Sequence, residues 1–257
     1  MANPAAVAVY LRAVHKHKID SEAVVSGLTC LMFFWSLPIS SSRSMVDLKR
    51  LVDYILLYLI VDSELDSSSI SYSYKCSYLL ALLQENKTVP SKLNKMYCSL
   101  VSSELDASVF SHVTLTTAQS FLVQYNVSSA AELFEVCVNK GGQAVLAGYR
   151  LVYGNKCLQS ISDDQLLILG ACIQLLDDIV DCSKDKRDGI ETIATWTLRE
   201  LRQLDYLAIL LFILLFELEE GLAEQRDGLL VVSKRAVDRS SSFSANFRER
   251  LGLRRYK

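Results

Sequence analysis

The chain has 257 residues, of which 27 are basic and 29 acidic, so its net charge is close to zero. This balance gives no indication of a nucleic-acid partner, because such proteins carry an excess of lysine and arginine to neutralise phosphates. Hydrophobic residues make up 51% of the chain, which is enough to bury a large core in one domain.

The proline content predicts long helices. Only three prolines occur, and none follows Pro90. Because a proline inside a helix removes a hydrogen bond and clashes with the preceding turn, the proline-free remainder suits long packed helices. No segment shows the sustained alternation of apolar and polar residues typical of a strand. We therefore expect an all-α fold, with residues 1–257 in a single domain.

Apolar residues at three- and four-residue spacing place the helices along the chain. Helices are expected at 5–17, 21–35, 46–66, 71–85, 91–103, 116–125, 129–153, 163–186, 190–203, 204–224 and 227–238. Gly141 and Gly142 are expected to break or kink the helix that contains them. The basic tail, 234–257, is expected to be a solvated, frayed end, or else a flap that closes over an anionic ligand.

The run 206–216 is the most membrane-like part of the sequence, with eleven residues and no charge. A bilayer span needs roughly twenty, so we expect a buried core helix and no integral membrane segment. The seven cysteines form no metal-ligand pattern and are odd in number. Free thiols in a reducing compartment are the simplest interpretation, and we expect a cytoplasmic protein.

Three aspartates define the most informative segment, 174–188. Asp177, Asp181 and Asp185 are spaced four residues apart, so on a helix their carboxylates line one edge. Like charges stacked in this way call for a compensating cation or for exposure to water. Magnesium prefers oxygen ligands and is usually held by one or two carboxylates together with substrate phosphates. The row predicts either a magnesium site or a solvated helix end, with Lys184 placed to contact phosphate oxygens.

A second acidic pair closes the helix expected at 46–66. Asp62 and Asp66 are also four residues apart, and the residues before them are apolar. Two buried helices that each end in such carboxylates could hold a metal cluster between them, above an apolar pocket.

These acidic regions resemble those of class I isoprenoid synthases, a superfamily that includes terpene synthases, trans-isoprenyl diphosphate synthases and squalene or phytoene synthases. Residues 170–188 are similar to the second aspartate-rich region, and Asp62-Ser-Glu-Leu-Asp66 to a divergent first one. The resemblance implies a helical bundle with a central apolar cavity. It also implies three magnesium ions per site, which bind the diphosphate of an isoprenyl substrate while it ionises to a carbocation.

The ligand spacing is similar to that of the terpene-synthase branch, whose metal ligands stand at the first, fifth and ninth positions of the motif. This similarity implies that Asp177, Asp181 and Asp185 bind metal on one side of the cluster, with Asp62 and Asp66 on the other. The family usually has Ser or Thr in place of Asp181 and Glu in place of Asp185, and an aspartate can bind magnesium at either position.

The same segment also resembles the prenyltransferase pattern Asp-Asp-x-x-Asp, in which Asp177, Asp178 and Asp181 matter. Segments 170–174 and 139–141 are similar to that branch as well. Against it, the first acidic region lacks the second aspartate of the usual motif and is not followed by Arg-Arg-Gly. The head-to-head synthases share the four-residue spacing, but the proline expected after the second region is missing.

Further residues are implied in substrate binding by the same resemblance. Arg255-Tyr256 is similar to a pair near the end of many microbial terpene synthases that contacts diphosphate. No arginine occurs in 91–149, where the family's diphosphate-sensing arginine falls, and Lys140 is the candidate substitute. The aromatic side chains of Phe34 and Tyr58 could line a cavity and stabilise a carbocation.

We therefore expect a magnesium-dependent terpene synthase that ionises a fifteen-carbon isoprenyl diphosphate, cyclises the carbocation and releases diphosphate. The alternative is a prenyltransferase that condenses an allylic diphosphate with isopentenyl diphosphate. A third hypothesis is a helical partner protein that keeps the fold without catalysis. A homodimer is one of the oligomeric states that we expect.

Overall fold

The computed structural model of the chain describes residues 4–17, 21–66, 71, 73, 74, 77, 127, 129–240 and 242–251. Most of these residues are helical, with one isolated bridge between Ile39 and Cys157 and no strand among them. The all-α class expected from the sequence is confirmed for this part of the chain. The helices expected at 71–85, 91–103 and 116–125 lie wholly or mostly outside the described residues.

Contacts group the chain into two compact units. Unit 1 comprises residues 1–115 and 147–159, and unit 2 comprises residues 116–146 and 160–257. Helix α7 (Ala130–Tyr153) contributes its first part to unit 2 and its last part to unit 1. The single-domain organisation stays a prediction, and the units are described separately.

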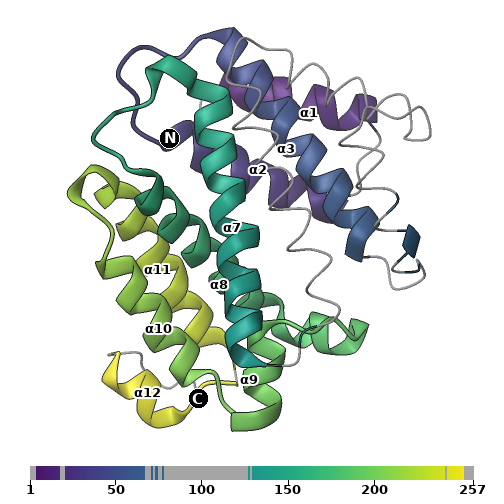
Figure 1. Ribbon diagram of the computed structural model, residues 1–257, viewed down its shortest axis with the longest axis vertical. Helices are drawn as coiled ribbons and strands as arrows, with labels where there is room; N and C mark the ends of the chain where they lie inside the picture. The colour runs from purple at the N-terminus through teal and green to yellow at the C-terminus, as the bar shows by residue number, and fades with distance from the viewer. Residues whose placement is uncertain are drawn as a thin grey trace. The chain divides into compact units, whose positions relative to one another are not determined.

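Unit 1 contains α1 (Pro4–His17), α2 (Ser21–Ser36) and α3 (Met45–Asp66), which pack against one another (Figure 1). Their apolar faces supply its core, in which Leu31, Leu51 and Leu56 are fully buried. The buried Tyr10 of α1 donates a hydrogen bond to the Val24 carbonyl of α2. The bonded hydroxyl lets a tyrosine fill the core without leaving a buried polar atom unpaired.

Three polar contacts tie the end of α7 and the turn after it to α2, to the loop after α2 and to α3. The Tyr149 hydroxyl donates to the Pro38 carbonyl at 2.7 Å, and the Tyr153 hydroxyl donates to the Phe34 carbonyl at 2.5 Å. The Lys156 ammonium lies 2.6 Å from the Asp47 carboxylate at the start of α3. The two tyrosine bonds provide partners for the Phe34 carbonyl in the last turn of α2 and the Pro38 carbonyl just after it.

Unit 2 contains α8 (Asp163–Asp188), α9 (Ile193–Leu201), α10 (Asp205–Phe216), α11 (Ala223–Arg239) and α12 (Ala245–Arg250). Helix α8 begins where the Ser162 side chain accepts a hydrogen bond from the Gln165 amide, and it ends at Gly189, whose φ of 72° suits glycine. Helices α9, α10 and α11 all pack against α8 (Figure 1). The longest described helix is therefore the centre of unit 2.

The helix expected at 204–224 is interrupted, and this prediction was wrong. Helix α10 ends at Phe216, a short 3-10 turn follows at Glu220–Leu222, and α11 begins at Ala223. The Gln165 side chain of α8 donates to the Glu217 carbonyl and accepts from the Glu219 amide. The helix ends there because this side chain satisfies the backbone groups of the break and because Gly221 within it is a poor helix former.

The sequence predicted that Gly141 and Gly142 break or kink a helix. The break was wrong, because α7 continues through both, and the kink stays a prediction. Their role is close packing against α8. A β-carbon on Gly141 would lie 2.3 Å from the Gly170 oxygen, and one on Gly142 would lie 2.9 Å from the Leu167 oxygen. The two helices can cross at this distance only because the crossing residues lack side chains.

The apolar run 206–216 forms α10 but is not a buried core helix. Leu207, Leu211 and Leu215 are buried, whereas the opposite face is exposed to solvent. Among the described helices, none combines the length and the apolar character that crossing a membrane requires.

The basic tail is not frayed between residues 234 and 250, because most of this segment is helical. Residues up to Arg239 belong to α11, and α12 follows at Ala245–Arg250. The Asp205 carboxylate accepts hydrogen bonds from the amide and hydroxyl of Ser244, which caps α12. Arg248 donates to the carbonyls of Ser240 and Phe243. These bonds anchor the tail through residue 250.

Candidate functional site

The row of three aspartates lies on one continuous helix, as its spacing requires. Asp177, Asp181 and Asp185 occupy successive turns of α8, where Asp177 is exposed and the other two are half-buried. Eight residues of helix rise by about 12 Å, so the row is longer than the coordination sphere of one ion. Consistent with that length, no three His, Cys, Asp or Glu side chains in the described ranges converge on a common point.

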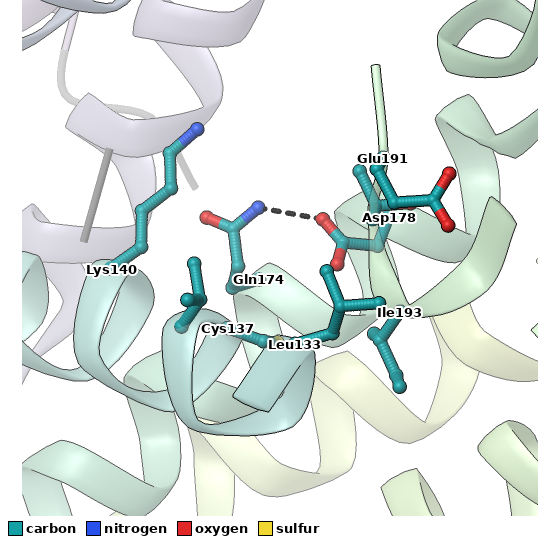
Figure 2. A pocket seen from close by; sticks show the side chains of 9 residues that line it. Leu133, Cys137, Lys140, Gln174, Asp178, Glu191 and Ile193 are labelled. Atoms are coloured by element: carbon teal, nitrogen blue, oxygen red, sulfur yellow. Dashed lines mark hydrogen bonds between the residues drawn. The ribbon is translucent and has the colours of Figure 1, made fainter. Parts of the chain in front are cut away.

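Asp178 points away from this row, into the protein. It is 7% exposed, and its carboxylate accepts a hydrogen bond of 2.9 Å from the Gln174 amide one turn earlier (Figure 2). Burial raises the pKa of Asp178 to about 7, against the opposing effect of the Gln174 hydrogen bond. The Asp177 charge raises it further, and the Lys140 ammonium lowers it.

The first turns of α7 complete a small pocket around Asp178. Cys137 and Lys140 line it from α7, Gln174 and Asp178 from α8, and residues 191–193 from the start of α9. Figure 2 shows the Gln174 side chain pointing toward Asp178, while the Glu191 carboxylate points away from it. Lys140 is 9% exposed. Burial, followed by the charge on Asp178, raises the pKa of the Cys137 thiol well above its usual value, so this thiol stays protonated.

The pocket is too small for an isoprenoid chain. It has room for about one water molecule. A bound water there would find donors and acceptors in Lys140, Gln174 and Asp178. The central apolar cavity expected from the family resemblance therefore stays a prediction.

The other residues expected at the site are distributed over both units. Asp62 and Asp66 form the last turn of α3 in unit 1, and their side chains lie outside the described residues, as do Arg255 and Tyr256. Lys184 is exposed on α8, one residue before Asp185. The structure thus describes only the α8 half of the expected metal cluster.

The two aromatic residues expected to contact substrate belong to unit 1. Phe34 is 5% exposed and packs edge-to-face against Tyr54, with ring centroids 6.0 Å apart. Tyr58 is half-buried on α3. Phe34 thus serves at least as a core residue, and the substrate contact of both stays a prediction.

Sequence reasoning did not identify Cys137, Glu191 and Thr192 as pocket residues. A usable signal existed for α7, because Leu133, Cys137 and Lys140 share one helical face. Glu191 and Thr192, just before α9, reach the pocket through the sharp turn at Gly189, and no periodic pattern reveals the direction of such a turn.

A scan against protein-family models, a search of curated proteins and a search of solved structures each gave no match.

Proposed function

We propose that the chain is a magnesium-dependent terpene synthase that ionises an isoprenyl diphosphate and cyclises the resulting carbocation. The observation that carries this proposal is the opposite orientation of two adjacent aspartates. Asp177 is exposed in line with Asp181 and Asp185, whereas Asp178 is buried and bonded to Gln174. The carboxylates accessible to a metal therefore have the first, fifth and ninth spacing of the terpene-synthase motif.

The donor set of this row fits magnesium. Carboxylate oxygens are its preferred protein ligands, and it is usually held by one or two of them while substrate phosphates and water fill the remaining positions. Asp181 with either neighbour in the row would supply such a pair. Bound magnesium would stabilise the negative charge that builds on the leaving diphosphate.

Basic side chains beside the row suit the same substrate. Lys184, Lys186 and Arg187 are exposed on the last turns of α8. Ammonium and guanidinium groups form strong charge-assisted hydrogen bonds with phosphate oxygens. They would hold the diphosphate while its bond to the isoprenyl carbon breaks, and they would balance the acidic row when no metal is bound.

A prenyltransferase is the second candidate, and one observation favours it. Lys140, Gln174 and Asp178, which carry the similarity to that branch, line a single pocket. In this alternative, these side chains would support binding of the allylic diphosphate beside the pocket, which is too small to admit it, and isopentenyl diphosphate would be the second substrate.

Two substitutions on α8 separate these candidates. Asp181→Ala removes a member of the exposed row, and Asp178→Asn keeps both the shape and the Gln174 hydrogen bond of the buried carboxyl. With magnesium and a fifteen-carbon allylic diphosphate, we expect Asp181→Ala to slow diphosphate release at least about 100-fold. Asp178→Asn should stay within about threefold of the unmodified chain, and both should keep the helical circular dichroism spectrum.

Each outcome of this experiment supports or contradicts one of the three hypotheses. Full activity of Asp181→Ala would contradict the proposed ligand row. Consumption of isopentenyl diphosphate, lost in Asp178→Asn, would support the prenyltransferase instead. If the unmodified chain releases no diphosphate, the non-catalytic hypothesis is favoured.

A further inference from the structure

Helix α10 presents a continuous apolar stripe to solvent. Tyr206 is 61% exposed, Ile209 43%, Ile213 53% and Phe216 70%. Their spacing of three, four and three residues places all four on one side of the helix. The half-buried residues that flank them, Leu210, Phe212 and Leu214, are apolar too. A helix that is apolar on every side normally has every side covered.

The stripe is symmetric about its own centre. Tyr206 and Phe216 each lie five residues from Leu211, and Ile209 and Ile213 each lie two residues from it. Leu211 is 1% exposed and belongs to the opposite, buried face. Two copies of α10 laid antiparallel about this point would pair aromatic with aromatic and isoleucine with isoleucine. A two-fold interface requires this self-complementarity, because each contact occurs twice.

The area of the stripe is sufficient for such an interface. With about 200 Å² for an aromatic side chain and about 100 Å² for an aliphatic one, the four side chains expose about 350 Å² per copy. Burying both stripes removes about 700 Å² of apolar surface, and a polar rim in the proportion typical of homodimers, which are about 65% apolar, would bring the total to about 1,100 Å². This exceeds the roughly 1,000 Å² expected of a biological interface.

Charged residues in the segments that flank α10 also match an antiparallel pair. The exposed Arg202 lies nine residues before Leu211, and the exposed Glu220 lies nine residues after it. Antiparallel pairing directs Arg202 of one copy toward Glu220 of the other, beside the exposed Glu217 and Glu219. A lipid surface fits less well, because interfacial helices carry lysine and arginine on their polar face, and α10 contains neither.

We propose that the α10 stripe is the interface of a two-fold homodimer, in which the α10 helices of two copies pack antiparallel about Leu211. This assembly is independent of the activity proposed above.

The oligomeric state of the full chain tests this interface. Sedimentation velocity from 1 to 100 µM should give twice the monomer mass of 28.8 kDa. Ile213→Arg places a charge at the centre of the stripe and should weaken the dimer at least about 100-fold. Val231→Arg is the matched control, because Val231 is 51% exposed on α11, outside the stripe, and this variant should remain dimeric. Circular dichroism verifies that both variants fold.

A charge exchange tests the antiparallel register without touching apolar residues. Arg202→Glu should weaken the dimer about threefold or more, and adding Glu220→Arg should restore it. An unmodified chain that stays monomeric at 100 µM overturns the proposal, whether or not it binds vesicles of anionic phospholipid. An Ile213→Arg dimer as tight as the Val231→Arg dimer overturns it as well, as does a charge exchange that fails to restore association.

Discussion

The backbones of Gly141 and Gly170 touch where α7 crosses α8. A β-carbon added to Gly141 would lie 2.3 Å from the Gly170 oxygen, and one added to Gly170 would lie 2.2 Å from the Gly141 oxygen. Neither oxygen can move away without shifting a helix. This contact fixes how closely Lys140, next to Gly141, approaches Gln174, one turn after Gly170. The glycine pair therefore shapes the pocket around Asp178.

Gly141→Ala should consequently destabilise unit 2. The added methyl group forces the two helices apart, which we expect to lower the free energy of unfolding by about 1–3 kcal/mol. Gly228→Ala is the matched control, because Gly228 lies within α11 and its added β-carbon has open space around it. That substitution should raise the free energy of unfolding by about 0.5–1 kcal/mol. Urea titration followed by circular dichroism measures both, and equal shifts of the same sign would refute the close contact.

The Lys156–Asp47 ion pair predicts a pH-dependent contribution to the stability of unit 1. The Asp47 side chain is 5% exposed and that of Lys156 is 31% exposed. Burial alone would raise the pKa of Asp47, but hydrogen bonds from Lys156 and Ser44 outweigh this effect and hold the pKa below its usual range. A lowered folded-state pKa stabilises the protein above the unfolded-state pKa of about 4, and this gain is lost as the pH falls through the folded-state value.

Lys156→Met should therefore lower the free energy of unfolding by about 1–2 kcal/mol at pH 7, a range reduced because Lys156 is partly exposed. The difference from the unmodified chain should shrink as the pH falls below about 4 toward the lowered folded-state pKa of Asp47. Lys234→Met, at an exposed position of α11, should leave stability unchanged at every pH. Denaturant titrations from pH 3 to pH 7 measure the three curves. A constant difference over this range would contradict the assigned pairing.

Magnesium with inorganic diphosphate should stabilise the chain against heat. A ligand that binds only the folded state at 100 times its dissociation constant adds about 2.7 kcal/mol of stability. We expect the midpoint of thermal unfolding to rise with both components together, and to rise much less with either alone. Asp181→Ala should lose the increase, whereas Asp178→Asn should keep it. An equal rise in both variants would place the binding elsewhere than on the α8 row.

Helix positions were largely predictable from apolar periodicity, and the exceptions have identifiable tertiary causes. The break after Phe216 contains Gly221 and depends on hydrogen bonds to Gln165, which lies 52 residues before Glu217. Helix α9 ends at Leu201, where Arg202 adopts a φ of 58° that is unusual for a residue other than glycine. Gly221 is a local signal for the first boundary, whereas the boundary at Arg202 has none.

The site was predictable where it depends on one helix and not where it depends on two. The four-residue spacing gave the α8 row, and the apolar neighbours Leu175, Ile179 and Cys182 could have indicated that Asp178 faces inward. The pocket also depends on the close crossing of α7 and α8 at Gly141 and Gly170, and on the turn that leads into α9. Those depend on the approach of segments distant in sequence, and periodicity within a helix carries no information about them.

Product analysis tests the proposed function most directly. The purified chain would be incubated with magnesium and the ten-, fifteen- and twenty-carbon allylic diphosphates, each with and without isopentenyl diphosphate. Gas chromatography would detect cyclic hydrocarbons and alcohols, and phosphatase treatment would release elongated prenols. We predict cyclic products without isopentenyl diphosphate, with the fifteen-carbon substrate used best. Longer prenols formed only when isopentenyl diphosphate is present, or no product in either arm, would contradict the terpene-synthase proposal.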